Sequence, residues 1–323
     1  MSNAIIKQQG PGAVVADNVW HLRLGAAPFA LGLLAGVAAA VLARRAAGET
    51  TGARAPARAM RTPTPSGWPV NFAHRGGRRI VPENTLEGFR EALAGRAAVI
   101  ETDAHTSADG VVVVIHDDTV DRTTDGTGPV ARKTLAELQR LDAGHRFTPD
   151  GGATFPWRGR GVTIPTLEAL YREFPERNIN IELKPTRPGT EEAVWRVVEA
   201  AAGQARTLVV TDDGASIKRF RDVSGGSVAT AASVAEFVKF WLLGKVRLAR
   251  LYRPPFQALQ PPDSYKGFRI VTPSLIRQAH AAGLRVDVWT IDDEDDMRRL
   301  LAWGVDGIMT DRPDVLARVL EEG

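Results

Sequence analysis

Short β-branched runs alternate with helical patterns through most of this chain, and no other feature constrains its fold more strongly. After Trp68 the strand-like runs are separated by helical patterns of about ten residues, which is typical of βαβ units in a parallel sheet. The strand candidates lie at 71–75, 99–103, 111–116, 179–183, 207–212, 227–232, 285–290 and 307–311. Eight such units in about 250 residues predict an α/β fold, a (β/α)₈ TIM barrel. A doubly wound open sheet is the alternative.

The segment before the barrel has a different composition. Residues 26–43 are apolar and uncharged, and as a helix they would reach about 27 Å, close to the hydrocarbon thickness of a bilayer. We therefore expect a tail at 1–25, a transmembrane helix at 26–43, a linker rich in Ala, Arg, Thr and Pro at 44–69, and the barrel domain at 70–320. A cleaved signal peptide and a soluble helix are the alternatives for the apolar stretch.

Arg44 and Arg45 follow the apolar stretch at once, and a long leader precedes it, so an uncleaved anchor is favoured over a signal peptide. Basic residues are denser after the stretch than before it. By the positive-inside tendency this favours a cytoplasmic barrel. The predicted localisation is thus a single-pass membrane protein, with the cytoplasmic side slightly favoured for the catalytic domain.

The positive charge of the chain is concentrated near its beginning. Residues 1–69 hold seven basic and two acidic residues, which leaves 34 of the 41 basic and 36 of the 38 acidic residues for the remainder. A body without a positive field does not attract nucleic acid, so we expect no nucleic-acid partner. The absence of cysteine also excludes a disulfide framework, a thiolate zinc site and a cysteine nucleophile.

Two segments do not fit a simple repeat. Residues 121–161 are polar and glycine-rich and too long for an ordinary connection, so we expect an insertion that caps one face of the barrel. Residues 237–262 mix aromatic and aliphatic side chains with five Lys or Arg. This segment fits a helix at a membrane surface, and it fits a barrel helix with its apolar side in the core equally well.

Carboxylates fall on the inward faces of two predicted strands. Alternate residues of a barrel strand face inward, so Glu101 and Asp103 share one strand's face, and Glu182 lies on another. Such carboxylates repel one another unless a cation neutralises them, and ligands that are all oxygen suit Mg²⁺ or Ca²⁺ better than zinc. The alternative is an ion network in which these acids pair with Arg75 and Lys184.

His74 and His116 each stand at the end of a predicted strand, where the mouth of a barrel opens. Beside a metal site, two imidazoles suit a general base and a general acid. Arg75 and Lys184 add fixed positive charge that would stabilise a phosphoryl oxygen. The residues therefore favour a phosphate ester as substrate.

A series of short motifs in order along the chain resembles the glycerophosphodiester phosphodiesterase family, and the resemblance spans Val70 to Leu316. The motifs are AHRGG (73–77), PENT (82–85), ETD (101–103), HD (116–117), RTTDGTG (122–128), IPTLEAL (164–170), IELK (181–184), VWTID (288–292) and TDRP (310–313). One departure is Asp292, where family members often have asparagine.

The resemblance implies metal-dependent hydrolysis of a glycerophosphodiester to glycerol 3-phosphate and an alcohol. The implied roles are acid and base for His74 and His116, metal ligands for Glu101, Asp103 and Glu182, phosphate contacts for Arg75 and Lys184, and pocket walls for Glu83 and Trp289. Segment 237–262 resembles an apolar insertion of membrane-associated relatives. Two alternatives therefore remain: a lysophospholipase D that acts on lipid phosphodiesters in the membrane, and a silent barrel that binds phospholipid headgroups.

Overall fold

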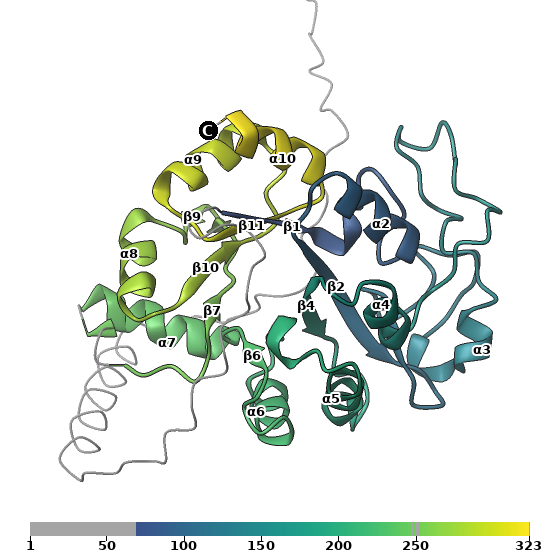
Figure 1. Cartoon of the computed structure of the whole chain (residues 1–323), viewed down its shortest axis with the longest axis horizontal. Helices are drawn as coiled ribbons and strands as arrows, with labels where there is room; N and C mark the ends of the chain where they lie inside the picture. Colours follow the sequence, from purple (N-terminus) through teal and green to yellow (C-terminus); the bar gives the residue numbers. More distant parts are fainter. Residues whose placement is uncertain (1–68, 247, 250–251, 323) are drawn as a thin grey trace, which may run out of the picture.

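The strands of this protein form a parallel barrel with helices on its outside (Figure 1). The computed structural model describes residues 69–246, 248–249 and 252–322. The strands follow the order β6-β5-β4-β2-β1-β11-β10-β7, and all pairings along this path are parallel. A bridge between Ala231 and Ala258 joins the two ends of the path. The predicted (β/α)₈ barrel is thereby confirmed, and the open sheet was the wrong alternative.

The barrel strands are short, and their bounds are β1 (Val70–Ala73), β2 (Val99–Thr106), β4 (Asn178–Leu183), β5 (Thr207–Val210), β6 (Ala229–Thr230), β7 (Ala258–Leu259), β10 (Arg285–Val288) and β11 (Gly307–Thr310). Three further strands lie outside the barrel. They are β3 (Val112–Val114), which pairs antiparallel with β2, and the hairpin of β8 (Ser264–Tyr265) and β9 (Phe268–Arg269).

The helices are α2 (Leu86–Ala94), α3 (Leu135–Leu138), α4 (Leu167–Glu173), α5 (Thr190–Ala200), α6 (Gly214–Val223), α7 (Val234–Lys245), α8 (Pro273–Ala281), α9 (Glu294–Trp303) and α10 (Pro313–Glu322). Several of them begin where the sequence offers a capping side chain. Thr85, Thr166 and Thr272 precede α2, α4 and α8, and each hydroxyl accepts an amide N–H of the first turn. These caps fix where the chain leaves each strand and enters its helix.

One predicted strand has a different place in the structure. The run 111–116 becomes β3, which turns back antiparallel to the outer end of β2 and takes no part in the barrel. The eighth barrel strand is β7, two residues within the segment 237–262. The sequence hides β7 because prolines 254, 255, 261 and 262 surround it, whereas four consecutive valines mark β3.

Helix α7 answers the question about segment 237–262. Phe237, Phe240 and Leu243 are buried in the largest apolar cluster, together with side chains of β7, α8 and β10. The apolar side of α7 is therefore core, as expected of a barrel helix. For residues 237–245 this packing supports the interpretation as a barrel helix.

Among the residues that the structure describes, no helix is both long and apolar enough to cross a bilayer. The longest, α7, has 12 residues and reaches about 18 Å, against about 30 Å of hydrocarbon. This finding contradicts the single-pass membrane localisation that we predicted, and we withdraw that prediction. The predicted transmembrane helix at 26–43 itself lies outside the described residues, as do the tail at 1–25 and the linker up to residue 68.

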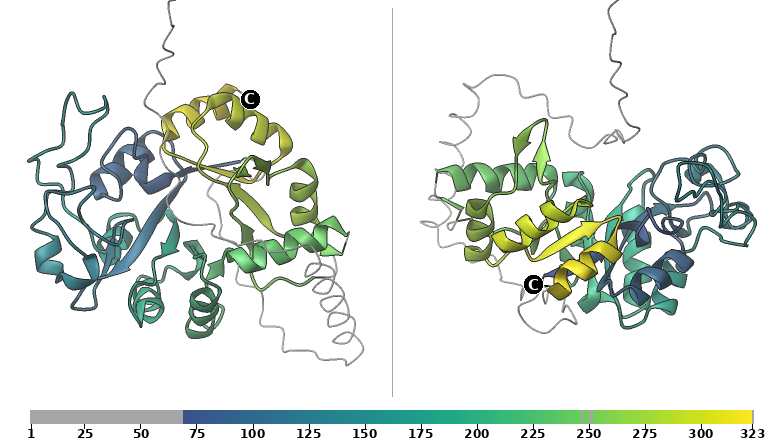
Figure 2. Two further views of the ribbon diagram at one scale, coloured as in Figure 1. Left: turned by 180° about the vertical axis from the view of Figure 1, so that it is seen from behind. Right: turned by 90° about the horizontal axis from the view of Figure 1, so that it is seen from above.

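The insertion 121–161 lies beside β3 and α2, at one side of the barrel (Figures 1 and 2). It is mostly irregular, contains α3, and packs Val130 and Leu138 into a small apolar cluster that it shares with β3. Asp142 and Asp150 accept backbone N–H groups of the same insertion and hold its turns. The insertion is thus a compact unit, and Arg122 at its start reaches the residues described next.

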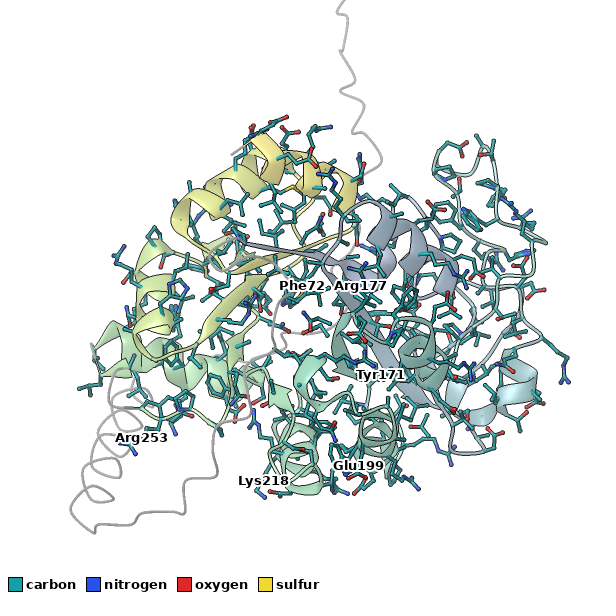
Figure 3. All side chains as sticks on the ribbon, in the orientation of Figure 1. Phe72, Tyr171, Arg177, Glu199, Lys218 and Arg253 are labelled. Atoms are coloured by element: carbon teal, nitrogen blue, oxygen red, sulfur yellow. The ribbon has the colours of Figure 1, made fainter. Side chains whose placement is uncertain are left out.

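The barrel interior changes from apolar to polar along its axis. Phe72 lies near the centre of the barrel in the view of Figure 3, in an apolar cluster with Val99, Leu208 and Met309. The next inward positions toward the C-terminal ends of the strands are charged, as on β2, where Glu101 and Asp103 follow Val99. The apolar floor therefore ends where the site begins.

Candidate active site

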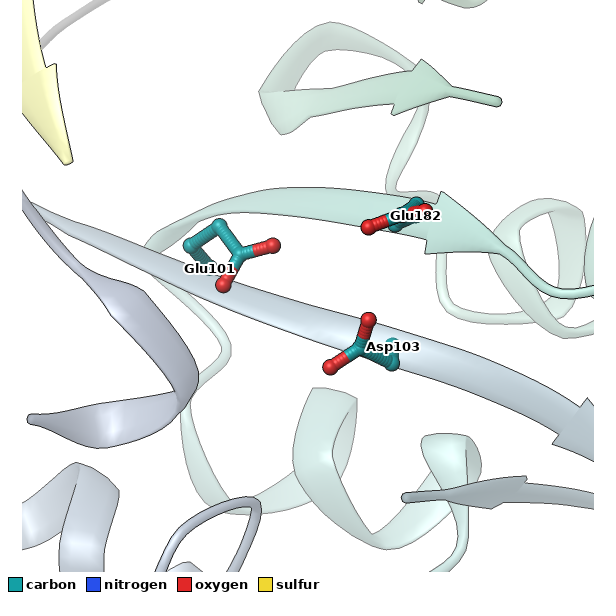
Figure 4. A group of neighbouring side chains, drawn as sticks. All are labelled: Glu101, Asp103 and Glu182. Carbon is teal, nitrogen blue, oxygen red and sulfur yellow. The ribbon is translucent and has the colours of Figure 1, made fainter. Parts of the chain in front are cut away.

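Three carboxylates meet where β2 and β4 run side by side. Asp103 stands directly opposite Glu182 in the parallel register, and Glu101 is two residues earlier on β2. One oxygen of each lies within 4.8 Å of the others, and Figure 4 shows the three groups turned toward one another. Glu101 and Asp103 are buried, and Glu182 is partly exposed. This convergence is what the alternation of residues along the strands predicted.

Two cations border the carboxylates. Lys184 Nζ lies 2.6 Å from Glu182 Oε1 and 3.3 Å from Asp103 Oδ1. The backbone N–H of Arg75 donates to Glu101 Oε2 at 3.0 Å, and the guanidinium Nε lies 3.5 Å from Asp103 Oδ2. The ion network that we considered as an alternative to a metal site is therefore present. An ion network and a metal site are compatible if Arg75 and Lys184 leave part of the negative charge of the three carboxylates uncompensated.

The pKa values of the two buried carboxylates shift in opposite directions. Burial raises the pKa of Glu101 well above its ordinary value, and the neighbouring Asp103 raises it further. Burial also acts on Asp103, but Lys184 and Arg75 outweigh it and hold the pKa of that carboxyl far below its usual range. Asp103 Oδ1 is buried and accepts no hydrogen bond, although Lys184 is close enough for an ion pair. An oxygen-only cluster with this deficit fits a hard divalent cation.

His74 stands where β1 ends, directly beside the end of β11. Its Nδ1 lies 2.6 Å from Asp311 Oδ1, and the buried Asp311 also accepts from Arg78 Nε at 2.6 Å. The register that pairs Ala73 with Thr310 brings the two next residues together. Asp311 therefore holds the imidazole by Nδ1, which leaves Nε2 as its other polar atom.

His116 reaches the same region from the loop after β3. Its Nδ1 lies 2.6 Å from Asp117 Oδ1, so both candidate acid/base histidines have a carboxylate on the same ring nitrogen. Arg122 donates to Asp117 and, by two further N–H groups, to Glu83. Glu83 in turn accepts from Arg75 Nη1 at 3.3 Å. This chain of ion pairs connects His116 to the carboxylate cluster and fixes the start of the insertion.

The two predicted wall residues are held by protein partners. The Glu83 carboxylate is 9% exposed and accepts from Arg75 and Arg122, so it orients those guanidinium groups. Trp289 donates its indole N–H to Gln260 O at 2.6 Å, and its ring packs against the apolar interior cluster. Gln260 donates to Asn180 on the inner face of β4. Glu83 is therefore part of the ion-pair chain at the site, and Trp289 is connected through Gln260 to the inner face of β4.

Sequence reasoning missed several supporting side chains although their motifs were visible. Asp311 lies in the TDRP motif, and Asn84 in the PENT motif donates to Asp103 Oδ2 at 2.9 Å and accepts from Thr102 Oγ1 at 2.8 Å. Asn84 has a φ of 55°, in the left-handed region that asparagine tolerates. Asp292 Oδ1 accepts from Thr310 Oγ1 and the Asp311 N–H. An asparagine oxygen would accept the same two bonds.

Glu83 gives a prediction on stability and pH. Burial opposes its ionisation, but hydrogen bonds from Arg122 and the charge of Arg75 lower its pKa to about 2. Because the folded-state pKa lies below the unfolded one, this carboxylate stabilises the fold above about pH 4.5, and the contribution disappears as pH falls toward 2. We expect wild type to lose about 3 kcal/mol more than Glu83→Gln between pH 6 and pH 2.

Denaturant unfolding of both proteins at a series of pH values measures this difference in free energy. The matched control is Glu199→Gln, an exposed carboxylate on α5. Parallel pH curves for wild type and Glu83→Gln would contradict the assignment of these ion pairs as stabilising.

Fold and site together define a barrel enzyme that acts on a phosphate ester. The model of the glycerophosphoryl diester phosphodiesterase family matches residues 74–315, and the chain belongs to that family. The predicted family and the predicted class of enzyme, a phosphodiesterase, are thereby confirmed.

Similar proteins agree with this assignment over nearly the whole barrel. A glycerophosphodiester phosphodiesterase of Caldanaerobacter subterraneus is 32% identical over 257 residues, which cover 78% of this chain and 98% of the relative. The solved structure of a glycerophosphodiester phosphodiesterase from Agrobacterium tumefaciens has a TM-score of 0.63 and 28% identity, covering 78% of this chain and all of the other. An Oleispira antarctica phosphodiesterase, solved in complex with the product sn-glycerol-3-phosphate, has a TM-score of 0.62 and 27% identity, covering 79% and 97%.

Proposed function

We propose that this protein hydrolyses glycerophosphodiesters to sn-glycerol 3-phosphate and an alcohol with the help of a divalent cation. The observation that carries the proposal is the convergence of Glu101, Asp103 and Glu182 in a site that His74 and His116 border, each held through Nδ1 by a carboxylate. The Oleispira antarctica relative, whose structure holds sn-glycerol-3-phosphate, supports the product.

Glu101, Asp103 and Glu182 would hold the cation, and Mg²⁺ and Ca²⁺ are the ions that such carboxylates prefer. Bound there, the cation supplies Lewis-acid polarisation of a phosphoryl oxygen and neutralises charge. Asn84 keeps Asp103 oriented through Oδ2 and leaves Oδ1 without a hydrogen bond. The fold places the oxygens of these three carboxylates close together at the same level of the barrel.

The two imidazoles move the protons. With Nδ1 of each ring directed at a carboxylate, Nε2 is left to exchange a proton with the substrate. One histidine takes the proton of the attacking hydroxyl, and the other returns a proton to the leaving alkoxide. Asp311 and Asp117 stabilise whichever ring is protonated at a given step, since each lies 2.6 Å from its Nδ1.

Arg75 and Lys184 are proposed as the phosphate contacts. The Arg75 guanidinium and the Lys184 ammonium both lie at the carboxylate cluster. Burial lowers the pKa of each group, but the surrounding carboxylates raise it by more, so each pKa lies above its ordinary value. They therefore keep a positive charge at every pH at which the fold is stable. Trp289 gives an apolar wall beside them, with its N–H turned to Gln260.

Water-soluble glycerophosphodiesters are the proposed substrates in preference to lysophospholipids. The apolar face of α7, which supported a lysophospholipase D, is packed into the core. We expect kcat/KM for glycerophosphocholine to exceed that for lysophosphatidylcholine by about tenfold or more, which corresponds to about 1.4 kcal/mol. Choline release from both substrates measures the ratio, with lysophosphatidylcholine kept below its critical micelle concentration.

The obvious deletion of residues 237–262 would not separate the two activities, because it would remove barrel strand β7. A better variant is Trp241→Ala with Lys245→Ala, which alters the partly exposed side of α7 where this pair stacks. Faster turnover of lysophosphatidylcholine by wild type, lost in this variant, would favour the lysophospholipase D. No turnover of either substrate would favour a barrel that binds headgroups without catalysis.

A further inference from the structure

His105 is a buried imidazole that the proposed mechanism does not use. It follows Glu101 and Asp103 on the same face of β2, two residues beyond Asp103, and its side chain is fully buried. At this point β2 has passed its last pairing with β1 and is held by β3 on one side and β4 on the other. His105 therefore lies at the junction of the barrel with the loops that carry the site.

Both ring nitrogens of His105 have partners in those loops. Nε2 lies 3.0 Å from the backbone oxygen of His116, and Nδ1 lies 3.3 Å from Thr186 Oγ1. A carbonyl oxygen only accepts, so Nε2 carries the proton and donates it. In a neutral ring Nδ1 is then the acceptor, and the Thr186 hydroxyl donates to it. One tautomer satisfies the whole arrangement.

These two contacts have a specific consequence for the site. Thr186 follows Lys184 by two residues, so His105 joins the segment after β4 to the backbone of the candidate acid/base histidine.

His116 follows the outer strand β3, and the residue before it is attached to β2, since the Ile115 N–H donates to the Asp103 backbone oxygen at 3.2 Å. The His105 bond extends this attachment to the backbone of His116 itself. The side-chain contact of His116 with Asp117 lies within the same loop and cannot fix that loop against β2.

We infer that His105 is a positioning residue that holds the His116 imidazole in register with the β2 and β4 carboxylates through its hydrogen bond to the His116 carbonyl. This inference rests on the proposed acid/base role of His116. The alternative is that the hydrogen bonds of His105 stabilise the fold and do not position His116. The positioning role and the structural role predict different values of kcat when the His105 imidazole is replaced by a side chain of similar size without an N–H.

Two variants make the comparison. His105→Leu fills the space without a donor, and His105→Gln keeps an N–H that can reach the same carbonyl oxygen. We expect kcat of His105→Leu for glycerophosphocholine to fall about tenfold or more with KM unchanged, since a displaced acid/base group costs rate and not ground-state binding. His105→Gln should recover most of that loss. Equal losses in both variants, or none in His105→Leu, would overturn the inference.

A double-mutant cycle with His116→Ala tests whether His105 acts through His116. Alanine retains the backbone oxygen that His105 binds, so the fold contact survives while the imidazole is gone. We expect His105→Leu to cause no further loss of kcat in the His116→Ala background. An undiminished loss there would assign His105 to folding alone, and near-native activity of His116→Ala would refute the acid/base role itself.

Should His105→Leu fail to fold, Thr186→Val addresses the same point from the other ring nitrogen. Without the hydroxyl, Nδ1 loses its donor, and the bond to the His116 carbonyl alone orients the ring. A lowered kcat with an unchanged melting temperature would support the inference. An unchanged kcat would overturn it.

Discussion

Replacing His74 by alanine is expected to lower kcat for glycerophosphocholine by about 10²- to 10⁴-fold, the usual cost of losing a positioned acid or base. The imidazole stands at the end of β1 with Nδ1 on Asp311, so alanine removes the Nε2 that is proposed to exchange the proton. Asp311 keeps its contact with Arg78 in the variant, which should leave the melting temperature nearly unchanged. Steady-state kinetics and thermal unfolding of the same preparation measure both effects.

The chain contains a matched control for this substitution. His280 forms a similar pair with Asp306, 2.8 Å apart, at the opposite end of β11 from Asp311. His280→Ala removes an imidazole from an Asp–His pair of the same kind, but far along the strand from the candidate site. Its kcat should equal that of wild type. If both variants kept full activity, His74 would not be the acid or the base.

The carboxylate cluster could be predicted from sequence because it depends only on the period of a strand. Inward positions alternate, so Glu101 and Asp103 share a face once 99–103 is recognised as a strand. Strand β4, the parallel neighbour of β2, then has to place Glu182 opposite these carboxylates. The observed register pairs Glu182 with Asp103. No loop geometry enters this argument, which is why it succeeded.

His116 was placed at the site by an argument that the structure does not bear out. The prediction treated 111–116 as a barrel strand with His116 at its open end, whereas β3 is antiparallel and lies outside the barrel. What brings His116 near the site is a loop fixed by Asp117, Arg122 and the His105 contact. These contacts join residues 1, 5 and 11 positions apart, and they follow no strand or helix period that a sequence could display.

The carboxylate that pairs with His74 could not be predicted from the local pattern either. Asp311 and His74 are separated by 237 residues, and they meet only because β1 and β11 close the barrel. Strand β7 was missed because two residues among prolines carry no strand pattern, and closure supplies the pairing that propensity does not. The closure of the barrel therefore determines strand β7 and the His74–Asp311 contact, which the local sequence pattern does not indicate.

Removal of divalent metal is expected to abolish turnover, and this is the second large effect. After EDTA and its removal, kcat/KM for glycerophosphocholine should fall about 100-fold or more, and Mg²⁺ or Ca²⁺ should restore it. The physical reason is that three carboxylates face two cations, Arg75 and Lys184, and that burial and the neighbouring Asp103 raise the pKa of Glu101. At a free cation concentration of 100 times the Kd, binding to this cluster would also stabilise the fold by about 2.7 kcal/mol.

That stabilisation allows the cation to be tested without relying on activity. The melting temperature of the EDTA-treated protein should rise on titration with Mg²⁺ or Ca²⁺, and the rise should vanish in Glu182→Gln, which removes one carboxylate from the cluster. Glu199→Gln, exposed on α5, should respond like wild type. Lys184 pairs with Glu182 at 2.6 Å, so an ion network alone would make Glu182→Gln less stable at every metal concentration. If the melting temperatures of wild type and Glu182→Gln differed by a constant amount and neither responded to metal, the cluster would be an ion network without a bound cation. That result would refute the proposed cofactor.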